Sequence, residues 1–293
     1  AAGHVESLGR HLAECEAVDR WEAAGSFRRC KETVGDLDIL VRASERSEAT
    51  EQILEYGSID EVMSRGEERV SVRLEGGLQV DFRYFEPASF GSALMYFTGS
   101  KAHNIALRKM AREHDWKLNE YGLMRGEERL AGRTEKSVYD RLDLAWVPPE
   151  MREDRGELDL AAADELPELI ETDDVRGDLQ THTDATDGSL SIGEMVEAAV
   201  ARGYEYLAIT DHSKAVAVAN GLDEDELKEH ADRIRQADDE ADDIRVLAGV
   251  EVDVLKSGKL DLDERLLADL DWVVASVHYS LQMNESDMTD RLL

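Results

Sequence analysis

The pattern that most constrains the fold is an alternation of short apolar runs and amphipathic helical segments, which begins near residue 172. Each run is long enough for one β-strand and is followed by a loop and a helix-period segment. Such alternation is typical of βα units, whose strands are parallel. The four runs are VRGDLQTHT (175–183), YEYLAIT (204–210), IRVLAGVEVDVL (244–255) and WVVASVH (272–278).

The preceding part mixes helical periodicity with strand-like alternation, including a hairpin predicted to turn at Gly76-Gly77. A Pro pair followed by charged residues predicts a linker. At 293 residues the chain is long enough for more than one domain. We expect a mixed domain at 1–90, a largely helical one at 91–146 with an extended stretch near 118–123, a linker at 147–171, and the alternating domain at 172–293.

The charge is strongly acidic: 66 acidic and 34 basic residues give a formal net charge of -32. Alone, this balance argues against binding a polyanion such as DNA. However, the acidic residues occur in nearly every segment, as in proteins from salt-loving organisms, where molar salt shortens the Debye length to about 3 Å. We therefore expect a halophilic protein in which a local basic strip still binds phosphate.

The chain has two cysteines, Cys15 and Cys30, which cannot form a disulfide framework. No apolar run approaches the roughly 20 residues of a membrane span, and the first residues do not resemble a signal peptide. We expect a cytoplasmic protein without membrane contact.

Three carboxylates form the first candidate site. Strand alternation places Asp36 and Asp38 on one face, about 6.6 Å apart along the strand, and Asp81 joins them if its strand lies alongside. Such a set suits two Mg²⁺ ions for phosphoryl transfer. The alternative for a bare D-x-D is a pair of surface aspartates. The Gly25-Ser26 turn and Arg29 favour the metal site, because both offer donors to phosphate.

The segment GSFRRCKETVGDLDILV (25–41) resembles the palm motif of family X DNA polymerases, as do VDFR (80–83), YFTGSKAHN (96–104) and KLNEYGL (117–123). The resemblance implies an α+β nucleotidyltransferase-like palm followed by a thumb, in which Asp36, Asp38 and Asp81 hold two metals. It also implies that Gly25, Ser26, Arg29 and Gly35 contact the triphosphate, that Tyr96, Phe97 and Gly99 line the sugar side of the nucleotide pocket, and that Asn104 and Arg108 face the base pair and template.

One departure concerns the start of the chain. Family members begin with a helix-hairpin-helix domain that grips the 5′ phosphate of a gap, and none precedes residue 20 here. This puts lyase activity in doubt and favours a fragment of a longer protein.

Six further residues lie at or near the C-terminal ends of the apolar runs, where parallel sheets place their chemistry. Mixed imidazole and carboxylate ligands suit Zn²⁺, Mn²⁺ or Fe in a cluster that hydrolyses phosphate esters. A lone histidine at such a place is more often structural, but three in succession favour a metal site. The residues are His182, Asp187, Asp211, His212, Glu251 and His278.

The region 172–293 resembles a PHP (polymerase and histidinol phosphatase) domain, which implies the first four or so strands of an α/β (β/α)7-type barrel with up to three metals, here Mn²⁺ or Zn²⁺. The family's first strand usually ends in H-x-H, whereas this chain has Gln180 before His182. Later family ligands would lie beyond Leu293.

Together the two resemblances imply a bacterial or archaeal type of family X polymerase that fills gaps in DNA repair. Its PHP domain would trim 3′ ends by Mn²⁺-dependent 3′ to 5′ exonuclease or related phosphoesterase action. The expected partners are gapped or nicked DNA and deoxynucleoside triphosphates, and the expected state is a monomer. Two alternatives are a phosphoesterase whose polymerase half only positions DNA, and a non-catalytic module that binds DNA ends.

Overall fold

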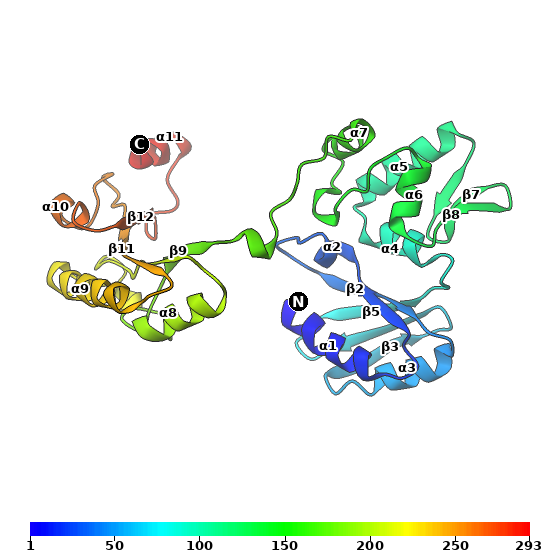
Figure 1. Ribbon diagram of the computed structural model, residues 1–293, viewed down its shortest axis with the longest axis horizontal. Coiled ribbons are helices and arrows are strands. Elements are labelled where there is room, and N and C mark those ends of the chain that lie inside the picture. Colours follow the sequence, from blue (N-terminus) through cyan, green and yellow to red (C-terminus); the bar gives the residue numbers. More distant parts are fainter. The chain divides into compact units, whose positions relative to one another are not determined.

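The computed structural model describes residues 1–293 and divides them into two compact units, Ala1–Glu168 and Leu169–Leu293 (Figure 1). Each unit has its own hydrophobic cores. None of the helices is both long and apolar enough to span a bilayer.

The first unit is built on a five-stranded sheet of order β1-β2-β5-β4-β3, in which only β2 and β5 are parallel neighbours. One face, bearing Leu37, Ile39 and Val41, packs against two helices, whereas Leu40 on the other face packs against a third. These are the helices α1 (Ala2–Glu14), α3 (Arg46–Leu54) and α4 (Phe90–Thr98), and the strands are β1 (Arg20–Ala23), β2 (Asp36–Arg42), β3 (Ile59–Arg65), β4 (Arg69–Leu74) and β5 (Gln79–Tyr84).

The predicted hairpin is present between β4 and β5. Gly76 and Gly77 have φ angles of 83° and 89°, a conformation that residues with a Cβ rarely adopt. The turn returns the chain antiparallel to β4 and brings β5 alongside β2.

The remainder of the first unit is less helical than expected. Three short strands follow the helices in an antiparallel sheet of order β6-β7-β8, whereas the sequence pattern indicated one extended stretch near 118–123. Strands of three or four residues are too short for a clear alternating pattern. The elements are α5 (Lys101–Glu113), β6 (Lys117–Asn119), β7 (Gly122–Arg125), β8 (Glu128–Ala131) and α6 (Glu135–Arg141).

Most of the segment predicted as a linker, 147–171, is part of the first unit. Val147 and Ala161 are buried in the same core as α5 and α6, and Arg152 is fully buried. The Pro pair leads into a 3-10 turn, Pro149–Met151, which is followed by α7 (Glu157–Ala163). The chain therefore leaves the first unit at Glu168, not at residue 147.

The second unit contains the four predicted parallel strands, in the order β12-β11-β10-β9. Its sheet is the first part of an α/β barrel, and the residues of β10 and β11 that pack against α9, such as Ile209 and Val246, form a core with that helix. The elements are β9 (Gly177–Thr181), α8 (Ile192–Ala201), β10 (Tyr206–Ile209), α9 (Glu224–Glu240), β11 (Arg245–Asp253), α10 (Glu264–Leu267), β12 (Trp272–Ser276) and α11 (Glu285–Leu292).

Candidate active sites

The first site lies on β2 and β5. Asp38 and Asp81 are direct partners in the parallel register, and Asp36 lies one strand repeat before Asp38. Asp81 is 6% exposed and Asp38 is partly buried, whereas Asp36 is exposed. The structure thus brings the three predicted carboxylates to one sheet face, with one of them open to solvent.

Arg83 is a residue of this site that the sequence analysis missed. Its Nε donates to Asp38 Oδ1 at 3.1 Å and its Nη2 donates to Asp81 Oδ2 at 3.0 Å, while the guanidinium lies over the Phe97 ring. Burial raises the pKa of Asp38 more than the hydrogen bond and charge of Arg83 lower it. Arg83 therefore partly neutralises both carboxylates.

A cavity of about 350 Å³ opens beside these carboxylates. All the predicted residues of this site line the cavity except Gly35 and Asp81. Thr98 and Lys101, which were not predicted, line it as well. Its walls include Gly25, Ser26, Arg29, Asp36, Asp38, Tyr96, Phe97, Gly99, Asn104 and Arg108.

Two of the wall residues are held by the protein itself. Arg29 Nε donates to Glu153 Oε1 at 2.9 Å, and Asn104 Nδ2 donates to the Tyr96 carbonyl at 2.7 Å. Gly25 has a φ of 66°, and a Cβ there would lie 3.3 Å from Asp38 Oδ2. Glycine thus lets the turn approach the carboxylate closely.

A buried ion network supports this wall. Arg28 in α2 (Gly25–Arg28) donates two hydrogen bonds to Glu135, at 2.7 and 2.8 Å, and Arg152 Nη1 donates a third at 2.7 Å. Burial alone would raise the pKa of Glu135, but the hydrogen bonds and charges of both arginines outweigh it and lower the pKa to about 2. The network ties the Gly25-Ser26 turn to α6.

The second site lies at the C-terminal ends of β9 to β12, around Glu251. Glu251 Oε2 lies 3.1 Å from His182 Nε2 and 3.8 Å from His212 Nδ1. The other carboxylate oxygen, Oε1, lies 3.3 Å from His278 Nε2. Asp187 lies 3.4 Å from His212 Nε2. The structure therefore brings together five of the six predicted ligands, three imidazoles and two carboxylates.

The donor set fits a divalent transition metal. Atoms of His182, His212 and Glu251 lie within 4.8 Å of one another. The buried Nδ1 atoms of both histidines lack a hydrogen-bond partner. Since buried polar atoms are normally paired, ring nitrogens that lack a hydrogen bond but lie 3.6 and 3.8 Å from the carboxylates of Asp187 and Glu251 suit Zn²⁺ or Mn²⁺.

The structure does not bring Asp211 to this cluster. The side chain is fully buried, and its oxygens accept hydrogen bonds from the Thr183 backbone and hydroxyl, the Thr186 hydroxyl and His230 Nε2. Burial would raise the pKa of Asp211, but these bonds, first that of His230, lower it to about 2. Asp211 instead anchors the 183–186 loop, which lies between His182 and Asp187.

Gln180 does reach the cluster. Its Nε2 donates to Glu251 Oε2 at 3.0 Å, so a neutral amide occupies a place beside the carboxylate.

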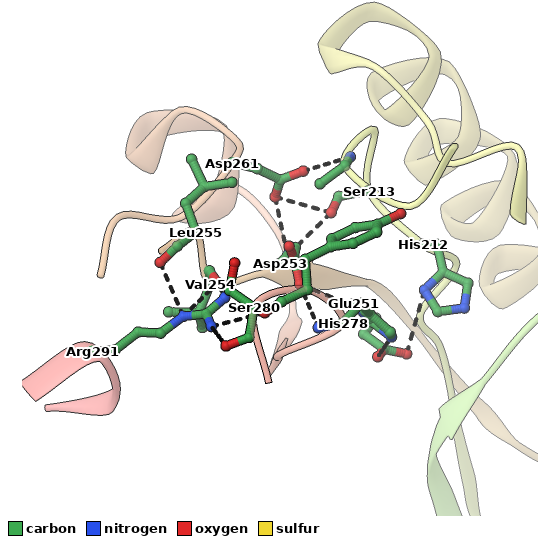
Figure 2. A network of polar contacts seen from close by, with 12 residues as sticks. His212, Ser213, Glu251, Asp253, Val254, Leu255, Asp261, His278, Ser280 and Arg291 are labelled. Atoms are coloured by element: carbon green, nitrogen blue, oxygen red, sulfur yellow. Dashed lines mark hydrogen bonds and ion pairs between the residues drawn. The ribbon is translucent and has the colours of Figure 1, made fainter. Parts of the chain in front are cut away.

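Asp253 is a further neighbour that the sequence analysis missed, and it contacts His278 (Figure 2). Its position two residues after Glu251 on the same strand could have signalled it.

Known proteins match both units. The family model of the DNA polymerase beta thumb matches residues 93–153, and that of the PHP domain matches residues 178–292. DNA polymerase/3'-5' exonuclease PolX of Bacillus subtilis is 40% identical over 292 residues, which are 98% of this chain and 51% of that protein. Rat DNA polymerase lambda is 29% identical over 161 residues, 45% of this chain and 28% of that protein. A protein of Photobacterium profundum named probable phosphatase is 35% identical over 120 residues, 40% of this chain and 46% of that protein.

The fold and the two sites define a polymerase-beta-like palm and thumb followed by a PHP domain. The chain belongs to the family X DNA polymerases that carry a PHP domain. It spans about half the length of the Bacillus relative.

Proposed function

We propose that this chain provides a DNA-directed DNA polymerase that fills gaps in repair by two-metal nucleotidyl transfer, and a PHP unit that trims 3′ ends. The observation that carries the proposal is the register of β2 and β5, which pairs Asp38 with Asp81 and leaves Asp36 on the same face. Three carboxylates on one sheet face suit two Mg²⁺ ions that retain open positions for phosphate and hydroxyl oxygens.

At the polymerase site, bound Mg²⁺ supplies the charge that activates the primer hydroxyl and stabilises the leaving pyrophosphate. The chain's own residues bind and orient the nucleotide. Ser26 and the backbone at Gly25 face the triphosphate, with the Arg29 guanidinium as a nearby positive charge, and the Tyr96 and Phe97 rings lie beside the sugar in the same cavity. Asn104 and Arg108 on α5 face the base pair.

At the PHP site, His182, Asp187, His212, Glu251 and His278 hold the metal. Bound Mn²⁺ or Zn²⁺ supplies a hydroxide and polarises the 3′ terminal phosphodiester. Trimming of this kind leaves the 3′ hydroxyl that the polymerase site extends, so the two activities complement each other in repair.

The proposed partners are gapped or nicked DNA and deoxynucleoside triphosphates. Although the net charge is -32, α5 carries a local cationic strip that suits the template backbone. The strip is Lys101, Arg108, Lys109 and Arg112. We also propose a monomer that acts in the cytoplasm of a salt-loving organism.

Each of the two alternative functions leaves one of the two sites without a purpose. A phosphoesterase whose polymerase half only positions DNA has no need for a complete carboxylate set beside a nucleotide-sized cavity. A non-catalytic module that binds DNA ends has no need for the imidazole cluster around Glu251.

The test uses the 293-residue chain and a duplex with a labelled primer at a one-nucleotide gap. We expect one-nucleotide extension with Mg²⁺ and nucleotides, 3′ shortening with Mn²⁺ and no nucleotides, and neither product with EDTA. Shortening without extension would favour the phosphoesterase alternative. Binding of the gapped duplex without either product would favour the non-catalytic one.

A further inference from the structure

Asp253 is a buried carboxylate that lies beside the candidate metal cluster without belonging to it. It is the last residue of β11, two positions after Glu251, and is 1% exposed. Its Oδ1 accepts hydrogen bonds from the backbone N of His278 at 3.1 Å and from the ring Nδ1 at 3.2 Å (Figure 2). Both the main chain and the ring of His278 therefore depend on one carboxylate oxygen.

This contact decides which ring nitrogen of His278 faces the cluster. Because a carboxylate only accepts, the proton lies on Nδ1, and Nε2 points to Glu251 Oε1 at 3.3 Å. The ring of His278 is also edge-on to that of His212, with centroids 5.2 Å apart. A histidine in this tautomer presents the Nε2 lone pair to a metal.

Asp253 is itself held firmly. Its backbone N donates to Asp261 Oδ1 at 3.0 Å, and Ser213 Oγ donates to the same oxygen at 2.9 Å. Asp261 Oδ2 accepts from the Ala215 backbone at 2.9 Å. Asp261 thus joins the end of β11, which carries Glu251 and Asp253, to the loop that follows His212.

The buried Arg291 of α11 holds the same region from another direction. Its guanidinium donates to the carbonyls of Val254 and Leu255, just after Asp253, and to that of Tyr279, just after His278. Figure 2 shows Arg291 beside Val254 and Leu255. The pair is therefore fixed on both sides of its hydrogen bond.

We propose that Asp253 is the positioning residue that presents Nε2 of His278 to the metal. The inference rests on the proposed metal site of the PHP unit. Outer carboxylates that orient a histidine ligand contribute about 10- to 100-fold to metal affinity. The role differs from that of Asp211, whose carboxylate reaches no candidate ligand side chain and binds the 183–186 loop and His230 instead.

The test compares Asp253→Ala and Asp253→Asn with Asp238→Asn in the 293-residue chain. Asp238 is a matched control, because its carboxylate accepts from Val246 at the opposite end of β11 and does not reach the cluster. Mn²⁺ affinity is measured by calorimetry. The tautomer of His278 is measured by ¹⁵N NMR of the ring nitrogens, in the metal-free chain and with Zn²⁺.

We expect Asp253→Ala to weaken Mn²⁺ binding by about 10- to 100-fold and to abolish the single Nδ1–H tautomer of His278. Asp253→Asn retains an acceptor and should have a smaller effect, and Asp238→Asn should have none. Wild-type affinity and tautomer in a folded Asp253 variant, or equal losses in Asp238→Asn, would overturn the proposal. If wild-type protein binds no Mn²⁺, the proposed function fails instead, and the tautomer in the metal-free chain still decides the role of Asp253.

Discussion

Asp38 and Asp81 lie opposite each other on the parallel strands β2 and β5, and Arg83 donates a hydrogen bond to each carboxylate. Two acidic groups that would repel each other are thus bridged by one cation. A bound metal would compete with Arg83 for the same oxygens.

This arrangement makes Arg83→Gln a test of the first site. Without metal, we expect the substitution to lower the free energy of unfolding by about 1.5–3 kcal/mol, the range for hydrogen bonds to charged groups. With Mg²⁺, the variant should gain more stability than the wild type, because the metal relieves a larger repulsion and binds more tightly. Thermal unfolding with and without Mg²⁺ measures both. A smaller gain in the variant would show that Arg83 does not occupy the metal's place.

The carboxylates and strands of this site follow from a local pattern. The alternation in DLDILV and QVDFRY predicts two strands with Asp36, Asp38 and Asp81 on single faces. The register that pairs Asp38 with Asp81 depends on packing between strands that are distant in sequence. Arg83 could have been predicted by the same alternation, since it lies two residues after Asp81 on the same face of the strand.

Two other predictions differ from the structure because of contacts with residues that are distant in sequence. The segment after Pro148 looked like a linker because it is charged, yet Arg152 and Glu157 are buried through bonds to Glu135 and His103. Asp211 looked like a ligand because it follows the C-terminal end of an apolar run, but its carboxylate oxygens already accept hydrogen bonds from another loop and from α9. Partners that come from elsewhere in the fold leave no signal in the local sequence.

The Glu135 network predicts a pH-dependent stability. The folded-state pKa of about 2 lies below the ordinary value of 4.5, so the stabilisation is fully present above about pH 4.5 and is lost as the pH falls toward 2. A shift of this size corresponds to on the order of 3 kcal/mol. We expect Glu135→Gln to destabilise the chain by about 3 kcal/mol at pH 7, and the difference from wild type to shrink as the pH falls.

Urea unfolding at several pH values measures this difference. The control is Glu128→Gln, because Glu128 pairs with Arg125 on the exposed surface and should contribute less than about 1 kcal/mol. A Glu135→Gln penalty that stays constant from pH 7 to pH 3 would show that packing, not charge, accounts for the loss.

The net charge of -32 predicts a salt requirement. Repulsion among carboxylates is strong at low ionic strength and is screened in molar KCl, where the Debye length falls from about 10 Å to about 3 Å. The melting temperature should therefore rise with KCl from about 0.1 M to molar concentrations. Highest stability in dilute buffer would contradict the halophilic interpretation.

Replacing Gln180 by histidine should raise the metal affinity of the second site. Its amide lies 3.0 Å from Glu251 Oε2, so an imidazole at this place could add a nitrogen ligand. We expect Gln180→His to bind Mn²⁺ on the order of tenfold more tightly, which corresponds to about 1.4 kcal/mol. Calorimetry compares it with Gln236→His on the exposed side of α9. Equal affinity in the two variants would show that position 180 does not reach the metal.

The central claim is that the chain carries two independent sites, and one measurement tests it most directly. Asp81→Asn and His212→Ala are compared with wild type on the same gapped duplex, after circular dichroism has shown that both variants fold. Asp81→Asn should reduce extension about a hundredfold or more while 3′ shortening persists, and His212→Ala should do the reverse, because metal-supplied charge stabilisation is worth several kcal/mol at each site. Loss of both activities in each folded variant would contradict the account.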